Sequence, residues 1–330
     1  MTTDAAAETD AVTAHLARRG LIDSPDGVVV RPLTGGVSND VLAVTGPGVD
    51  VVVKRALGRL RVAEEWLADP GRIDTEGRAL QLAGRLLPGA VPAVRDLADG
   101  YLVIERAPDR WHTWKEDLLT GRVDVAVAAL LGRALGVWQR ETARDPGVTA
   151  DFDDVTAFHQ LRVDPFHRTV ANRHPDLAEV IGRTVEDMAA ARVCLVHGDY
   201  TPKNVLVDPD GPGAWVIDWE VAHVGDPTFD PAWTLGHLLL KTVHRPSAAA
   251  AYAAAGGAFL AALHRELAGA VPIDEQQLVR QLGCLLLARV DGKSPADYLT
   301  GDERVVTRDL ARRLLTDPPA TPTDAWRLLG

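Results

Sequence analysis

The chain has 330 residues, 46% hydrophobic and 25% charged, which is enough apolar material for a large core and two lobes. Its formal net charge of −11 argues against general binding to nucleic acid, and Cys194 and Cys284, both in apolar runs, suit buried thiols. No segment reaches the apolar length of a membrane span, and the acidic N-terminus is unlike a signal peptide, so we expect a cytoplasmic protein without a membrane partner. The sequence leaves the oligomeric state open.

The first part of the chain is predicted to form a helix and three strands. A helical pattern over 10–19 has Val12 and Leu16 on one face and indicates a solvated lead-in helix. The next apolar stretches are rich in valine and separated by short glycine-containing connections, which predicts an antiparallel meander. These strands are expected at 28–33, 41–44 and 49–54.

The same meander carries candidate contacts to a nucleotide. Gly35, Gly36 and Ser38 lie between its first two strands, where backbone amides could approach phosphate groups, although an ordinary hairpin turn is the commoner meaning of two glycines there. Lys54 closes the third strand. Alone it would be a solvated edge charge, but its place after the glycine pair favours a lysine that binds nucleotide phosphates.

A helix is predicted over 74–87, where leucines recur at roughly helical spacing before a proline and a glycine. Glu76, in its first turns, is our candidate for an ion pair that orients Lys54. Glu64 and Glu65 are the alternatives, on the preceding connection.

Two further strands, at 92–97 and 101–107, complete a predicted five-stranded sheet. The irregular stretch 107–114 breaks the pattern and marks a boundary between a nucleotide-binding lobe, 1–107, and a catalytic and acceptor-binding lobe, 108–330. Beyond the boundary the chain is predicted to be mostly helical. The helices are expected at 123–140, 175–192, 248–265, 275–290, 302–316 and 323–329, with another beginning near 232.

The most informative stretch, 195–207, places polar residues of fixed type between two apolar strands. Asp199 and Asn204 lie in this loop, and Asp218 ends the next apolar strand. Phosphoryl transfer uses a carboxylate to orient the attacking hydroxyl and oxygen ligands to hold magnesium. The pattern therefore predicts Asp199 as the catalytic base and Asn204 and Asp218 as magnesium ligands, with an Asx turn as the alternative for the loop alone.

The sequences HGDYTPKN at 197–204 and IDWE at 217–220, followed by GDPTFD at 225–230, resemble the catalytic-loop and metal-loop signatures of the aminoglycoside phosphotransferase and choline kinase-like group. The likeness covers nearly all of the chain after about residue 26. It implies a bilobal, protein-kinase-like α+β fold, with a small antiparallel lobe and a larger helical one. It also implies an enzyme that uses ATP and Mg²⁺ to phosphorylate a hydroxyl of a small molecule.

The resemblance also implies roles for single residues. The segment from Glu105 to Ala107 would be the hinge whose backbone contacts adenine. Asp226 would anchor the metal loop and Asp230 would cap the next helix. His197 would pack and hydrogen-bond within the loop.

Several alternatives stay open at this level. The stretch 60–76 locally resembles 5-methylthioribose kinase, although Asn204 stands where that family has serine. GTP is an alternative to ATP, and an antibiotic and a sugar-like metabolite are alternative acceptors. A pseudokinase that binds nucleotide without turnover is the alternative from another class. Lys203 is interpreted as a solvated loop lysine, or as a substitute for the phosphate-facing lysine of protein kinases.

A late motif follows an apolar helix and contains Arg289, Asp291 and Lys293. One interpretation returns these residues to the active site, where the cations would suit an acceptor with a carboxylate or phosphate. The other is a helix end, with Gly292 at the turn and Pro295 starting the next helix.

Overall fold

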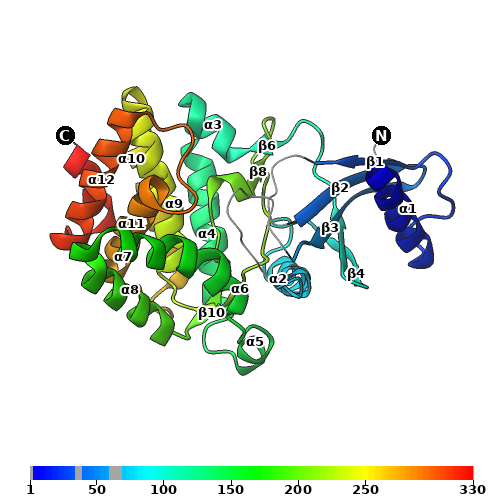
Figure 1. The fold of residues 1–330 in the computed structure, drawn as a ribbon, viewed down its shortest axis with the longest axis horizontal. Coiled ribbons are helices and arrows are strands. Elements are labelled where there is room, and N and C mark those ends of the chain that lie inside the picture. The colour runs from blue at the N-terminus through cyan, green and yellow to red at the C-terminus, as the bar shows by residue number, and fades with distance from the viewer. Residues whose placement is uncertain (1–2, 34–38, 59–68, 330) are drawn as a thin grey trace.

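A computed structural model describes residues 3–33, 39–58 and 69–329 (Figure 1). A five-stranded antiparallel sheet lies at the N-terminal end of the molecule, and helices make up the C-terminal end (Figure 1). The strands, in the order β1-β2-β3-β5-β4, are β1 (Val29–Pro32), β2 (Asn39–Gly46), β3 (Val49–Ala56), β4 (Val94–Ala98) and β5 (Tyr101–Glu105). The predicted meander and five-stranded sheet are confirmed.

Two helices cover opposite faces of this sheet, because successive side chains of a strand point to opposite sides. Helix α1 (Thr3–Arg18) packs Val12 and Leu16 into a cluster with Val53, and α2 (Arg72–Leu86) packs into a cluster that contains Val52. The expectation of a solvated helix over 10–19 is wrong, because α1 begins at Thr3 and its apolar face is buried on the sheet.

The second unit is built from helices. Its long helices lie close to the predicted positions, whereas the short ones at 114–120, 146–151, 156–158 and 169–173 were not predicted. The helices are α3 (Trp114–Thr120), α4 (Val125–Glu141), α5 (Pro146–Asp151), α6 (Thr156–Phe158), α7 (Thr169–Arg173), α8 (Ala178–Ala190), α9 (Phe229–His244), α10 (Ala249–Leu267), α11 (Glu275–Asp291) and α12 (Gly301–Thr316), with the 3₁₀-helices η2 (Pro175–Leu177), η3 (Pro202–Asn204), η4 (Pro246–Ala248) and η5 (Pro322–Leu329). A π-helix, η1 (His159–Arg168), was not predicted. Its proline and wide turn leave no period of 3.6 residues to detect.

The helical stretch Pro246–Leu267 has 22 residues and a mean hydropathy of 1.3, enough by length and composition to cross a membrane. The expectation that no segment reaches this apolar length is therefore wrong. In the structure α10 packs against α4 and α9, and its Tyr252, Phe259 and Leu263 are fully buried. It is a core helix of the bundle.

Two small antiparallel sheets hold the catalytic-loop region. One pairs β7 (Cys194–Val196) with β10 (His223–Gly225), and the other joins β6 (His112–Thr113), β8 (Val205–Val207) and β9 (Ala214–Val216). Because β6 pairs with β8, the chain at His112 and Thr113 is already joined to the catalytic-loop strands, a few residues past the proposed boundary between lobes 1–107 and 108–330. Cys194 and Cys284 are buried free thiols, as predicted.

Candidate functional site

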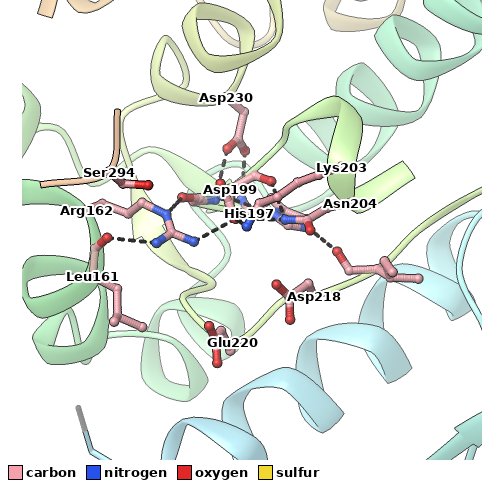
Figure 2. A network of polar contacts seen from close by, with 12 residues as sticks. Leu161, Arg162, His197, Asp199, Lys203, Asn204, Asp218, Glu220, Asp230 and Ser294 are labelled. Carbon is pink, nitrogen blue, oxygen red and sulfur yellow. Dashed lines mark hydrogen bonds and ion pairs between the residues drawn. The ribbon is translucent and has the colours of Figure 1, made fainter. Parts of the chain in front are cut away.

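The loop after β7 is shaped by a glycine at position 198. Gly198 has φ +79°, and a Cβ there would lie 2.8 Å from Val221 Cγ2 and 2.9 Å from the Val221 carbonyl oxygen. Only glycine satisfies both the left-handed conformation and the close packing. The turn presents Asp199 at the centre of the polar network in Figure 2.

Three donors surround the carboxylate of Asp199 (Figure 2). Its Oδ2 lies 2.8 Å from Asn204 Nδ2, 2.8 Å from Arg162 Nη2 and 2.9 Å from Lys203 Nζ. Burial alone would raise the pKa of Asp199, but the charges of Arg162 and Lys203 outweigh burial and lower it. Asp199 is therefore ionised at neutral pH and held in one orientation.

Two of these contacts differ from the sequence analysis. Arg162 comes from the π-helix η1 and also donates Nε to the Gly198 carbonyl at 2.9 Å, and no motif in the sequence marked it. Lys203 is half exposed, but its ammonium pairs with Asp199 instead of extending into solvent as a free loop lysine.

The loop is fixed to α9 by Asp230. Its two carboxylate oxygens accept the backbone N–H groups of His197 at 2.7 Å and Gly198 at 2.9 Å. The expectation that Asp230 caps the following helix is wrong, because α9 starts at Phe229 and Asp230 already lies inside it. Asp226, just before α9, accepts the backbone N–H of Thr228 at 2.8 Å.

His197 packs and hydrogen-bonds within the loop, as expected. Its Nδ1 accepts the N–H of Asp199 at 3.1 Å, so Nε2 carries the proton and donates to the Ile217 carbonyl at 3.1 Å. Burial lowers the pKa of His197 to about 4, so the ring is neutral.

Lys54 joins the sheet to the loop that contains Asp218. Its Nζ lies 2.5 Å from Glu76 Oε1 and 2.9 Å from Asp218 Oδ1, so the ion pair expected with Glu76 is present. Burial raises the pKa of Glu76, while the charges of Lys54 and Lys203 outweigh burial at Asp218 and lower its pKa. Asp218 has φ +71°, an uncommon conformation for a residue with a side chain, of the kind found at functional sites.

Asn204 and Asp218 offer the donor set that a magnesium ion requires. The Nδ2 of Asn204 is used on Asp199, which leaves its amide oxygen for a cation, and Asp218 contributes a carboxylate. These are hard oxygen donors, which suit Mg²⁺. Among the described residues no group of three His, Cys, Asp or Glu side chains is placed to hold a metal, so the remaining ligands would come from nucleotide and water.

Of the other residues predicted to contact the nucleotide, the structure describes only Glu105 and Ala107. Glu105 ends β5 and its side chain accepts the Ala93 N–H at 3.3 Å, and Ala107 follows on the connection to β6. Five predicted or alternative positions lie outside the described residues: Gly35, Gly36, Ser38, Glu64 and Glu65.

The late motif contains the predicted helix end, and the residues after it lie beside η1. Gly292 ends α11, and the chain then turns along η1, where Lys293 donates its N–H to the Pro165 carbonyl at 3.3 Å and Ser294 lies beside Arg162 (Figure 2). The guanidinium of Arg289 donates to the carbonyl and the hydroxyl of Ser294. Lys293 is exposed, and Pro295 does not start a helix, because α12 begins at Gly301 after a capping box.

Asp291, in contrast, belongs to a different network. Its carboxylate accepts Arg308 at 2.7 and 2.8 Å and lies 2.9 Å from His174 Nε2. These contacts tie α11 to α12 and to the end of α7. Asp291 is therefore a structural residue in this fold, and not one directed at the catalytic loop.

A buried triad that the sequence analysis missed connects the two units. Glu220 Oε2 accepts Arg72 Nε at 2.9 Å and Asn39 Nδ2 at 3.0 Å. Asn39 begins β2, Arg72 begins α2, and Glu220 follows the metal-loop Asp218. The last residue of the IDWE motif thus fixes the sheet and its helix against the catalytic region.

Comparisons with known proteins agree with this geometry. Residues 29–270 match the model of the phosphotransferase enzyme family, and the chain finds no match among curated protein sequences. Among solved structures, a choline/ethanolamine kinase family protein from Mesorhizobium loti is similar over 98% of this chain and 99% of its own, with 16% identity and a TM-score of 0.55. The macrolide 2′-phosphotransferase of Brachybacterium faecium is similar over 94% and 99%, with 20% identity and a TM-score of 0.52.

A third structure is amicoumacin kinase in complex with AMP-PNP and Ca²⁺. It is similar over 99% of this chain and 100% of its own, with 15% identity and a TM-score of 0.54. These similarities establish the bilobal, protein-kinase-like fold. They do not show the local resemblance to 5-methylthioribose kinase, which stays a prediction.

Proposed function

Because the chain belongs to the phosphotransferase enzyme family, we propose that it transfers the γ-phosphate of ATP to a hydroxyl group of a small molecule. The observation that carries this proposal is the convergence of Asp199, Asn204 and Asp218 from two loops, with Lys54 directed at Asp218 from the sheet. The AMP-PNP complex of a structural neighbour supports ATP as the donor.

In this proposal Asp199 is the catalytic base. Its carboxylate is ionised and oriented by Arg162, so it can accept a hydrogen bond from the acceptor hydroxyl and take its proton as the new O–P bond forms and ADP leaves. The neutral His197 and the buried carboxylate of Asp230 act through the loop backbone and keep the Asp199 carboxylate in place.

The groups proposed to bind ATP, the phosphate donor, lie in the sheet and the metal loop. Lys54, oriented by Glu76, would bind nucleotide phosphates, and the connection with Glu105 and Ala107 would contact adenine. A magnesium ion held by Asn204 and Asp218 would neutralise charge on the phosphates. Gly35, Gly36 and Ser38 remain proposed phosphate contacts.

The proposal is tested by magnesium-dependent ATP and GTP consumption against hydroxyl compounds of neutral, cationic and anionic character. Asp199→Asn removes the base but keeps the size of the side chain, so we expect kcat to fall about 10²- to 10⁴-fold. Nucleotide affinity, measured by calorimetry, should change little. Asp210→Asn, an exposed carboxylate in the turn after β8, is the matched control and should keep activity.

A nucleotide-binding pseudokinase is the competing outcome. It would give tight ATP binding, no turnover by the wild type with any acceptor, and no difference between the two variants. The local resemblance to 5-methylthioribose kinase predicts methylthioribose as an acceptor, and its inclusion in the panel tests that alternative directly.

A further inference from the structure

A group of basic side chains that form no ion pair with the described residues comes from helices near the catalytic loop. Lys115 comes from α3, Lys241 from α9 and Arg289 from the last turn of α11. Helix α3 packs against η3, which holds Lys203 and Asn204, and α9 packs against both α3 and α11. The three cations therefore come from three helices that pack against one another, one of which packs against the catalytic loop.

Lys241 is the most buried of these residues, with 1% of its surface exposed. Among the described residues its ammonium has one hydrogen bond, a long one of 3.4 Å to the Tyr298 hydroxyl, and lies 5.2 Å from the centre of that ring. No described carboxylate lies within ion-pair distance of it. A buried ammonium normally requires a close counter-charge, because its desolvation is costly.

Arg289 also forms no ion pair with the described residues. Its Nη1 donates to the Ser294 hydroxyl at 3.0 Å and to the Ser294 carbonyl, but its buried Nε has no partner among the described residues. Lys115 also forms no ion pair within the described part of the chain. By contrast Lys54 and Lys203, the lysines of the proposed catalytic machinery, both contact carboxylates.

The electrostatic effects agree with this arrangement. Burial and the neighbouring charges of Arg289 and Lys115 lower the pKa of Lys241 to about 7, and the charge of the exposed Asp297 opposes them. Burial also lowers the pKa of Arg289, against the charges of Tyr298, Asp199 and Asp297. The charge of Asp199 therefore acts on Arg289, which agrees with the packing of α3, α9 and α11 around the catalytic loop.

We propose that Lys241, Arg289 and Lys115 bind an anionic group, a carboxylate or a phosphate, on the acceptor molecule. The acceptor would then be a hydroxy acid or a phosphorylated alcohol whose hydroxyl lies against Asp199. This inference rests on the proposed function and names its substrate class. It disfavours polycationic antibiotics and choline, which these side chains would repel despite the net charge of −11.

The anion site is tested without turnover, by calorimetric titration of sulfate at pH 6.5 with ADP saturating the nucleotide site. We expect Lys241→Met and Arg289→Met each to lower sulfate affinity at least about tenfold, the loss of one buried charge contact. Arg280→Met, which removes another arginine of α11 that contacts Asp187 at 3.3 Å, is the control and should bind sulfate as the wild type does. Because methionine replaces a buried cation with an apolar side chain of similar length, Lys241→Met should melt no lower than the wild type.

A pH series adds a second readout. Sulfate does not titrate near neutrality, so its affinity should fall as the pH rises from 6 to 8.5 and Lys241 loses its proton, and Lys241→Met should lack this component. The groups around Lys241 that the series must account for are Lys115, His237, Arg289, Asp297 and Tyr298. Equal sulfate affinity in all variants, or no sulfate binding by the wild type, would overturn the inference.

Acceptor preference is then measured with matched compounds: glycerol, glycerate and glycerol 3-phosphate, and glucose, gluconate and glucose 6-phosphate, with choline as the cationic member. We expect the carboxylate or the phosphate member to have the higher kcat/KM, and Lys241→Met to remove that advantage. Turnover that favours neutral or cationic acceptors overturns the inference and leaves the phosphotransferase proposal standing. Sulfate binding that depends on Lys241, without turnover of any acceptor, would support the anion site and count against the phosphotransferase proposal.

Discussion

Arg162 Nη2 lies 2.8 Å from Asp199 Oδ2, and the same guanidinium donates Nε to the carbonyl of Gly198. One side chain therefore fixes both the proposed base and the backbone that presents it. We predict that Arg162→Met lowers kcat about 100-fold through misplacement of Asp199, with little change in nucleotide affinity. It should also raise the pKa of Asp199, so the acid limb of the pH–rate profile moves to higher pH.

Steady-state kinetics across pH check this prediction. Arg162→Lys should restore activity in part, because it keeps the positive charge but not the planar guanidinium that reaches both Asp199 and the Gly198 carbonyl. Arg168→Met is the control on the same π-helix, since Arg168 is exposed and contacts only Asp164 and solvent among the described residues. Equal kinetics for the two methionine variants would show that Arg162 does not position the base.

Asp230 gives a second prediction, on stability. Asp230→Asn replaces one of two acceptor oxygens with an amide that cannot accept the N–H of His197 or Gly198. Because the group is buried, we expect the free energy of unfolding to fall by about 1–3 kcal/mol, together with kcat. Urea titration measures the free energy of unfolding. The control Asp309→Asn, on the exposed face of α12, should change neither the free energy of unfolding nor kcat.

The elements and residues that the sequence predicted correctly share one property, which is that their signal is local. Valine-rich stretches between glycine-containing connections indicated the strands, and the fixed spacing of Asp199, Asn204 and Asp218 placed the proposed catalytic groups in one loop region. The Lys54–Glu76 pair was found because the lysine lies in the last strand before the helix that carries the glutamate.

The residues that the sequence did not predict act through tertiary contacts. Arg162 is distant in sequence from Asp199 and lies on a π-helix without a recognisable period, and the partners of Asp230 belong to another element. Lys241 looks in the sequence like the polar end of an apolar helix, and only packing against α3 and α11 shows that it is buried. The burial of α1 likewise depends on a sheet face that no pattern in the helix describes.

The triad around Glu220 gives a third prediction. Glu220→Ala removes the acceptor that Arg72 and Asn39 share, so we expect a loss of about 3–5 kcal/mol in the free energy of unfolding and weaker nucleotide binding, because the sheet is no longer fixed to the metal loop. Glu220→Gln keeps an acceptor oxygen and should lose less. Glu186→Ala, on the exposed face of α8, is the control, and an equal effect from both alanine variants would contradict the role of the triad.

A fourth prediction concerns acid stability. His223 is buried, donates Nδ1–H to the Val221 carbonyl and stacks on Phe158, and burial lowers its pKa to about 4. The unfolded chain has a histidine pKa near 6.5, so between pH 6.5 and 4 the unfolded state binds a proton that the folded state does not. This residue therefore has no effect on stability above pH 6.5 and removes about 3 kcal/mol as the pH falls to 4.

Urea titrations at pH 7, 5.5 and 4.5 check this sign. His223→Gln should flatten the fall in the free energy of unfolding, whatever its effect at pH 7. His264→Gln, half exposed near Glu275, should leave the slope unchanged. A slope that is the same in all three proteins would mean that His223 is protonated in the folded state.

The crossing of α4 and α10 gives the last prediction, because its closeness depends on a glycine. A Cβ on Gly132 would lie 2.0 Å from the carbonyl oxygen of Phe259, a backbone atom that no side-chain rotation can move away. We expect Gly132→Ala to lower the free energy of unfolding by about 1–3 kcal/mol or more. Gly257→Ala, on α10 itself, places its Cβ in open space and should raise stability by up to about 1 kcal/mol through helix propensity. Thermal and urea unfolding measure both variants, and opposite signs for the two glycine-to-alanine changes would separate the effect of close packing from that of helix propensity. A stabilising Gly132→Ala would show that α4 and α10 do not cross at this distance.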